Sequence, residues 1–148
     1  MKRQESYLFK NTVLKEGDKS AKTVFSGPGE LGVGPAPEFE GSPETLNPEE
    51  MFVAAINNCL MTTFFYFVRK SNVEVLSYHS DATGQVEKQA DGFRFTNVQV
   101  RAEVTLAQQE FAEKARQFGD LAEKYCLVSR SVNCPVQYEL EVRTTGKG

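Results

Sequence analysis

The apolar segment Asn47–Lys70, NPEEMFVAAINNCLMTTFFYFVRK, constrains the fold more than any other part of the chain. Asn47 is a suitable N-cap, and Pro48 suits the first helical position. Two glutamates follow, and an arginine and a lysine close the segment, so both ends complement the helix dipole. Apolar residues cover most of the circumference between them. The sequence therefore predicts a central helix over 48–70 that is surrounded by protein.

Cys59 lies near the middle of this predicted helix. Asn57 and Asn58 precede it, and Thr62 and Thr63 follow it closely. Polar side chains are costly in a packed core unless water or a substrate reaches them. A free cysteine, however, is among the residue types most often buried for packing alone. The position of Cys59 by itself therefore leaves both a reactive thiol and a structural one open.

Composition narrows the class of protein. A chain of 148 residues suits one domain, 1–148, and its 40% hydrophobic and 25% charged residues are ordinary for a globular protein. The net charge of −3 and the dispersed basic residues argue against nucleic-acid binding. Polar residues in the central segment argue against a membrane span. The start, MKRQESYLFK, lacks the apolar run of a secretory signal, so we expect a cytoplasmic location.

The cysteine count favours thiol chemistry over a structural framework. In a reducing compartment three cysteines do not indicate structural disulfides, and an odd number leaves at least one thiol outside any pair. Cys59, Cys126, Cys134 and the single histidine, His79, lack the spacing of a metal site. The sequence thus predicts neither a metal nor a bound cofactor, and His79 is assigned no role.

The remaining elements follow from hydrophobic periodicity and turn residues. They are an N-terminal β-hairpin over 1–26, a Pro/Gly-rich loop over 27–47, a β-hairpin over 73–106, an amphipathic second helix over 107–125 and a C-terminal strand over 134–144. A slip in the alternation near Thr96 predicts a β-bulge. Thr105 is a candidate cap for the second helix.

These elements predict an α+β fold with antiparallel strands wrapped around the long central helix. The central helix has more apolar surface than one small sheet and one amphipathic helix can cover. A homodimer that buries two such helices against each other is the simplest way to complete the core.

Two segments together resemble a known family. NPEEMFVAAINNCLMTT is similar to the cysteine-bearing helix of the OsmC/Ohr family of osmotically inducible and organic hydroperoxide resistance proteins, and AEKYCLVSRSVNCPVQYELEV is similar to its second cysteine segment. Their order and separation, the chain length and the PAPEF segment also fit. The turn EGDKS resembles the OsmC-like branch rather than the Ohr branch.

The resemblance implies an intertwined homodimer that reduces organic hydroperoxides with a pair of thiols. By position, Cys59 would be the peroxidatic thiol, Cys126 the resolving thiol and Glu49 an acidic residue of the site. The thiolate would cleave the O–O bond and become a sulfenic acid, which Cys126 would convert into a disulfide. An external dithiol of lipoyl or thioredoxin type would regenerate the protein. Phenylalanines near the thiol would favour hydrophobic peroxides.

Two features of this sequence bear on the site that the resemblance implies. Glu49 lies ten residues before Cys59, about 15 Å along a helix, so it would reach the thiol only from a partner subunit. The family's N-terminal arginine is missing, and its candidate replacements are Lys15, Lys19, Lys22 and Arg130. Lysine would supply charge without the bidentate guanidinium.

Two alternative functions remain open at this point. A hotdog-like acyl-thioester hydrolase also wraps strands around a long apolar helix, and Glu49 or Glu50 would then be its acid/base residue. A non-enzymatic family member would bind a hydrophobic ligand at the dimer interface. Cys134, followed by Pro135 and a strand, is predicted to be a buried structural cysteine.

Overall fold

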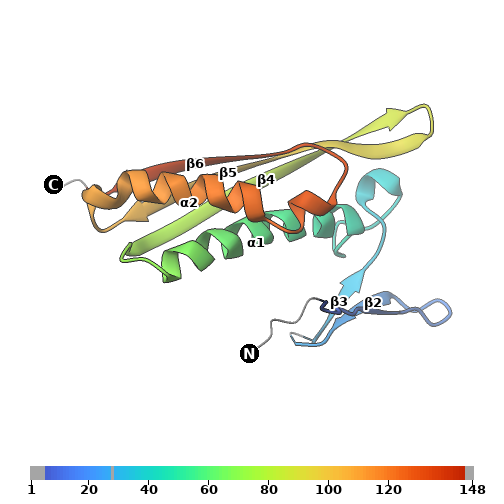
Figure 1. Ribbon diagram of the computed structural model, residues 1–148. Coiled ribbons are helices and arrows are strands. Elements are labelled where there is room, and N and C mark those ends of the chain that lie inside the picture. The colour runs from blue at the N-terminus through green and yellow to red at the C-terminus, as the bar shows by residue number, and fades with distance from the viewer. Residues whose placement is uncertain (1–5, 28, 146–148) are drawn as a thin grey trace. The chain divides into compact units, whose positions relative to one another are not determined.

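The computed structural model describes residues 6–27 and 29–145. In chain order the elements are β1 (Thr12–Leu14), β2 (Ala21–Phe25), β3 (Gly29–Val33), η1 (Pro37–Phe39), α1 (Pro48–Arg69), β4 (Val75–Gln89), β5 (Gly92–Leu106), η2 (Gln109–Phe111), α2 (Ala112–Tyr125), η3 (Ser129–Ser131) and β6 (Val136–Thr144) (Figure 1). The chain forms two compact units, Met1–Met51 and Phe52–Gly148. The organisation as a single domain stays a prediction.

The first unit contains a three-stranded antiparallel sheet in the order β1-β2-β3. The predicted hairpin corresponds to β1 and β2. The loop predicted over 27–47 is wrong in part, because it contains β3 and the 3-10 turn η1. The sequence of β3, GELGV, pairs through its backbone along the whole of β2, so it needs no alternation of apolar side chains.

The long helix α1 begins as the sequence predicts. The Asn47 side chain is the N-cap, since its Oδ1 accepts a hydrogen bond from the backbone N–H of Glu50 at 2.8 Å. The fully buried face of α1 is narrower than predicted. It consists of Ile56, Leu60, Phe64 and Val68, spaced four residues apart. By its length and its mean hydropathy of 1.6, α1 is long and apolar enough to cross a membrane. The core helix of a soluble protein can have the same length and hydropathy. In this chain, 22% of the apolar stretch is buried.

The second unit is built on a long sheet in the order β4-β5-β6. The β4–β5 hairpin is antiparallel, and it contains the predicted bulge. Gln85 pairs with Asn97 and Val86 with Phe95, so Thr96 is the extra residue.

The prediction that all strands run antiparallel is wrong for β6. This strand pairs parallel to β5, beginning with Val98 opposite Val136. The physical reason is the connection, because α2 crosses over between β5 and β6 and returns the chain to the end where β5 began. The second unit thus combines a β-hairpin with a βαβ crossover.

The second helix starts later than the predicted 107–125. Thr105 does not cap it, because Thr105 still pairs with Ser77 inside β5. The single 3-10 turn η2 follows, and the α-helix proper begins at Ala112 without a side-chain cap. Its buried face, which includes Phe118 and Gly119, packs on the sheet beside Leu140 of β6.

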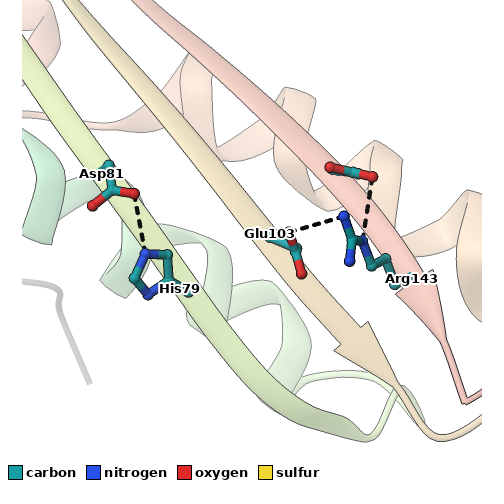
Figure 2. Close-up of polar contacts among 5 residues, drawn as sticks. His79, Asp81, Glu103 and Arg143 are labelled. Atoms are coloured by element: carbon teal, nitrogen blue, oxygen red, sulfur yellow. Dashed lines mark hydrogen bonds and ion pairs between the residues drawn. The ribbon is translucent and has the colours of Figure 1, made fainter.

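Helices α1 and α2 lie along one face of the long sheet (Figure 1). Between them and the sheet lie two clusters of buried side chains, one around Phe64 and Phe118 and one around Ile56 and Cys126. The opposite face of the sheet is polar. His79 pairs there with Asp81, and the guanidinium of Arg143 pairs with Glu103 (Figure 2). His79 therefore lies on the side of the sheet away from the buried cysteine.

Candidate functional site: two adjacent cysteines

Two cysteines that are far apart in the sequence meet in the second unit. Cys59 lies in the middle of α1, and Cys126 is the C-cap residue of α2. Cys126 is fully buried and Cys59 is half-buried, and both pack in the cluster around Ile56 and Leu60. Neither is in a disulfide, and Cys59 is near enough to Cys126 to raise the pKa of the Cys126 thiol. The fold thus brings the cysteine of α1 and the cysteine at the end of α2 into one cluster.

The hydroxyl groups that follow Cys59 are oriented by the helix backbone. Thr63 donates a hydrogen bond to the Cys59 carbonyl at 2.7 Å, and Thr62 donates to the same carbonyl at 3.1 Å. The Thr63 oxygen also lies 3.9 Å from the Cys59 sulfur. Because the hydroxyl hydrogen of Thr63 is already used, the thiol is the donor in that contact. Thr63 therefore orients the reduced side chain of Cys59.

Cys126 is held in the turn that follows α2. Its backbone N–H donates to Ala122, and its carbonyl accepts from the Ser129 hydroxyl at 3.2 Å and from the Arg130 N–H at 3.1 Å. Burial raises the pKa of the Cys126 thiol above its usual value. The hydroxyl and backbone N–H of Ser129 oppose this rise, whereas contact with Cys59 adds to it. The balance of these effects favours a neutral Cys126 at rest.

A chain of polar side chains lies next to the cysteines. The hydroxyls of Tyr78 and Tyr138 are 2.7 Å apart, Ser80 donates to Asn57 Oδ1 at 2.7 Å, and the Ser80 side chain is a polar neighbour of Tyr78. Burial raises the pKa of both tyrosines, and Tyr138 is close enough to Cys126 for their charged forms to repel each other. These residues come from α1, β4 and β6. The sequence did not single out either tyrosine, although alternation places both side chains on the inner faces of their strands.

The outer end of this chain opens into a cavity of about 370 Å³ between α1 and β4. Its lining includes Asn57, Asn58, Met61, Phe65, Tyr78 and Ser80. The amides that precede Cys59 therefore line a cavity, as the cost of burying them in a packed core suggested. Asn58 also donates to the Ala54 carbonyl at 2.8 Å.

Cys134 is more exposed than predicted. It is half-buried and lines a second cavity of about 420 Å³, which Phe52, Phe95 and Arg94 also line. The rings of Phe52 and Phe95 stack with centroids 4.3 Å apart. Cys134 packs against the same cluster as the other two cysteines. Its side chain is only half-buried, so the core does not fully enclose it.

Glu49 is not brought to the thiols by its own chain. It lies half-exposed in the first turn of α1, ten residues before Cys59. Since a helix rises about 1.5 Å per residue, that separation is far longer than a glutamate side chain.

The four residues that could replace the family's N-terminal arginine differ in their hydrogen bonds and ion pairs. Lys15 donates to two carbonyls of its own turn, and Lys19 and Lys22 each pair with a glutamate of the first unit. Arg130 is exposed in η3, four residues after Cys126, and it forms no ion pair with any residue that the structure describes. Within the second unit, Arg130 is thus the candidate cation nearest in sequence to the paired cysteines. Over residues 6–27 and 29–145, no group of three or more His, Cys, Asp or Glu side chains is arranged to hold a metal.

The fold and the site together define an α+β protein whose central helix carries a cysteine beside a second, buried cysteine. The family model for OsmC-like proteins matches residues 41–141. The chain therefore belongs to the OsmC-like protein family.

Relatives agree with this assignment. The uncharacterized protein YmaD of Bacillus subtilis (strain 168) is 27% identical over 107 residues, which cover 70% of this chain and 71% of YmaD. An OsmC-like protein of unknown function from Vibrio cholerae has a similar structure, with a TM-score of 0.80 and 24% identity over 91% of this chain and 99% of that one. An organic hydroperoxide resistance protein from Elizabethkingia anophelis gives a TM-score of 0.72 and 17% identity over 97% and 100% of the two chains.

Proposed function

We propose that this protein is a thiol-dependent peroxidase that reduces organic hydroperoxides to alcohols. The observation that carries the proposal is the packing of Cys59 and Cys126 in one cluster, which the fold forms from two distant segments. The half-buried Cys59 is the residue that a peroxide can reach, whereas Cys126 is enclosed. Cys59 is therefore assigned the peroxidatic role and Cys126 the resolving role.

The reaction then proceeds in three balanced steps. The Cys59 thiolate attacks the terminal peroxide oxygen, the O–O bond breaks, and the alkoxide takes up a proton and leaves as an alcohol, which gives a sulfenic acid. The Cys126 sulfur attacks the Cys59 sulfur and displaces hydroxide, which leaves as water with the Cys126 proton. An external dithiol, of lipoyl or thioredoxin type, reduces the disulfide and is itself oxidised.

The uncovered side of α1 supports a homodimer. Ala54, Asn58, Thr62 and Tyr66 are exposed at intervals of four residues, away from the buried face. A second copy packed there would cover this stripe, and an antiparallel α1 would bring the partner's first helical turn toward Cys59. Glu49 is proposed to act at the site from that partner turn. Arg130 or one of the N-terminal lysines is proposed to supply the positive charge.

The first test is a stopped-flow titration of the reduced, cytoplasmically expressed protein with cumene hydroperoxide, following free thiols. We expect rapid loss of two thiols per chain, and the same loss in the matched control Cys134→Ser. Cys59→Ser should abolish it, and Cys126→Ser should let Cys59 over-oxidise. Thiol loss no faster than that of a free thiol would refute the proposal.

The same variants separate the alternatives. A thioester hydrolase that uses Glu49 or Glu50 would keep its activity in Cys126→Ser. A protein that only binds a hydrophobic ligand would show neither rapid thiol loss nor thioester hydrolysis.

A further inference from the structure

The cavity beside Cys134 has no part in the proposed reaction. It has a volume of about 420 Å³, is open to solvent, and is lined by residues of α1, of the β4–β5 hairpin and of the segment before β6. All of these residues belong to the second unit. The volume falls in the range of small-molecule pockets, about 300–1,000 Å³. Neither the family assignment nor the pairing of the other two cysteines gives this cavity a role.

The cavity has an apolar floor and a polar rim. The floor consists of three half-buried side chains, Phe52, Phe95 and Cys134. The two aromatic rings stack with centroids 4.3 Å apart and an angle of 26° between their planes, so they form one aromatic surface. The rim contains three exposed polar residues, Gln89, Arg94 and Asn133. A ligand that matches both parts has an apolar body and a polar head.

The β-bulge in β5 brings consecutive residues to this cavity. In a regular strand, successive side chains point to opposite faces of the sheet. Thr96 is the extra residue of the bulge, and Arg94, Phe95 and Thr96 all line the same cavity. Bulges re-aim side chains and are over-represented next to active sites. The irregularity of β5 thus places a charged residue beside an aromatic one at a single cavity.

Arg94 gives the rim one positive charge. It is the only charged residue among the described residues that line the cavity. It lies opposite Glu87 in the β4–β5 hairpin. Its guanidinium nevertheless forms no ion pair with Glu87 or with any other acidic residue in the ranges 6–27 and 29–145. A guanidinium matches a carboxylate through two parallel N–H···O bonds. The charge and the apolar floor together complement a monoanion with an apolar body.

We propose that this cavity is a binding site for an amphipathic carboxylate. The carboxylate of such a small organic acid pairs with Arg94, and its apolar body lies on the rings of Phe52 and Phe95. Because Cys134 belongs to the same floor, the bound acid covers its thiol, and occupancy of the site controls the access of reagents to Cys134. The site uses neither Cys59 nor Cys126, so it does not depend on the proposed peroxidase function.

Protection of Cys134 from alkylation tests the site. In a Cys59→Ser/Cys126→Ala protein Cys134 is the remaining thiol, and the uncharged reagent iodoacetamide reports access to it. We expect sodium octanoate to slow alkylation in a saturable way, about tenfold when its concentration is about ten times its Kd. 1-Octanol has the same chain length without the carboxylate, so it should protect less at the same concentration. Absence of protection by octanoate would overturn the site, and equal protection by the two compounds would overturn carboxylate recognition.

A pair of arginine variants tests the role of Arg94 in the protein with all its cysteines. Arg101 is the matched control, because it is also exposed on β5 but pairs with Glu139 at 3.6 Å and lies outside the cavity lining. Isothermal titration calorimetry of the reduced wild type should give a Kd for octanoate with one site per chain. Arg94→Gln should raise this Kd about fivefold, and Arg101→Gln should leave it unchanged although it removes the same charge.

Salt provides a second readout of the same contact. Added sodium chloride should weaken octanoate binding to the wild type and to Arg101→Gln, because it screens the exposed guanidinium. Binding to Arg94→Gln should depend much less on salt. An equal loss of affinity in both arginine variants, or the same salt dependence in Arg94→Gln as in the wild type, would refute the pairing of the carboxylate with Arg94.

Discussion

Removing one hydroxyl from the Tyr78–Tyr138 pair should have very different costs depending on which tyrosine is changed. Ser80 has one hydroxyl hydrogen, and it is donated to Asn57. Tyr78 has the Ser80 side chain as a second polar neighbour, whereas the hydrogen bond described for the Tyr138 hydroxyl is the one to Tyr78. The two hydroxyls therefore differ in what each keeps when the other is removed.

The magnitudes follow from this difference. Tyr78→Phe leaves the Tyr138 hydroxyl without its hydrogen-bond partner, and an unsatisfied buried donor costs about 1–3 kcal/mol of unfolding free energy. Tyr138→Phe removes one hydrogen bond but leaves the Tyr78 hydroxyl beside the polar Ser80 side chain, which costs about 0.5–1.5 kcal/mol. The double variant leaves no orphaned hydroxyl between the strands. Its cost should therefore fall below the sum of the two single costs by about 1 kcal/mol.

The assay is urea unfolding of the three variants and the wild type, followed by circular dichroism. Tyr125→Phe is the control, because Tyr125 is 49% exposed and its change should leave the midpoint unchanged. Equal costs for the two single variants, with an additive double variant, would refute the difference in surroundings between the two hydroxyls.

Three further predictions concern stability. Asn47→Ala should lower the free energy of unfolding by about 1 kcal/mol in urea unfolding because α1 loses its N-cap, whereas Asn47→Asp should retain most of it. Gly119→Ala should destabilise by about 1–3 kcal/mol in the same assay despite the better helix propensity of alanine, because the new Cβ would lie 2.8 Å from Leu140 Cδ2; a gain in stability would contradict the close packing. Because burial raises the pKa of Tyr78 and Tyr138, the unfolded chain loses these protons first, so stability should fall as pH rises above about 10. Urea midpoints measured across this range should fall less steeply in the Tyr78→Phe/Tyr138→Phe protein.

The central helix and the second hairpin could be predicted because their signals are local. Asn47 and Pro48 mark the start of α1, and the prediction of its first turn is confirmed by the cap hydrogen bond. The slip in alternation at Thr96 is confirmed as a bulge. In both cases the residues that decide the structure are neighbours in the sequence.

The missed features depend on distant partners. Strand β3 has the sequence GELGV, which shows no alternation, and β2 defines it as a strand. The direction of β6 is decided by the crossover through α2, since the alternation of VQYELEVRT fits either direction. Thr105 has the residue type of a cap, but pairing with β4 extends β5 through it.

The candidate site likewise contains residues that local sequence signals indicate and residues that depend on distant partners. Cys59 was a candidate from its polar neighbours on α1, whereas Cys126 was chosen by resemblance to a family. The chain from Tyr138 to Asn57 depends on the register of β4, the parallel pairing of β6 and the rotation of α1 at once. No pattern within a single segment could indicate it.

The parallel pairing of β6 also has a consequence for how the protein folds. Strands β4 and β5 are joined by a short turn, so their contacts form between residues close in sequence and cost little chain entropy. The pair Val98–Val136 forms only after α2 and its flanking turns have closed the intervening chain. We therefore expect the hairpin to assemble early and β6 to dock late. Strand β6, which docks after α2 has formed, is thus the segment that completes the wall around Cys126.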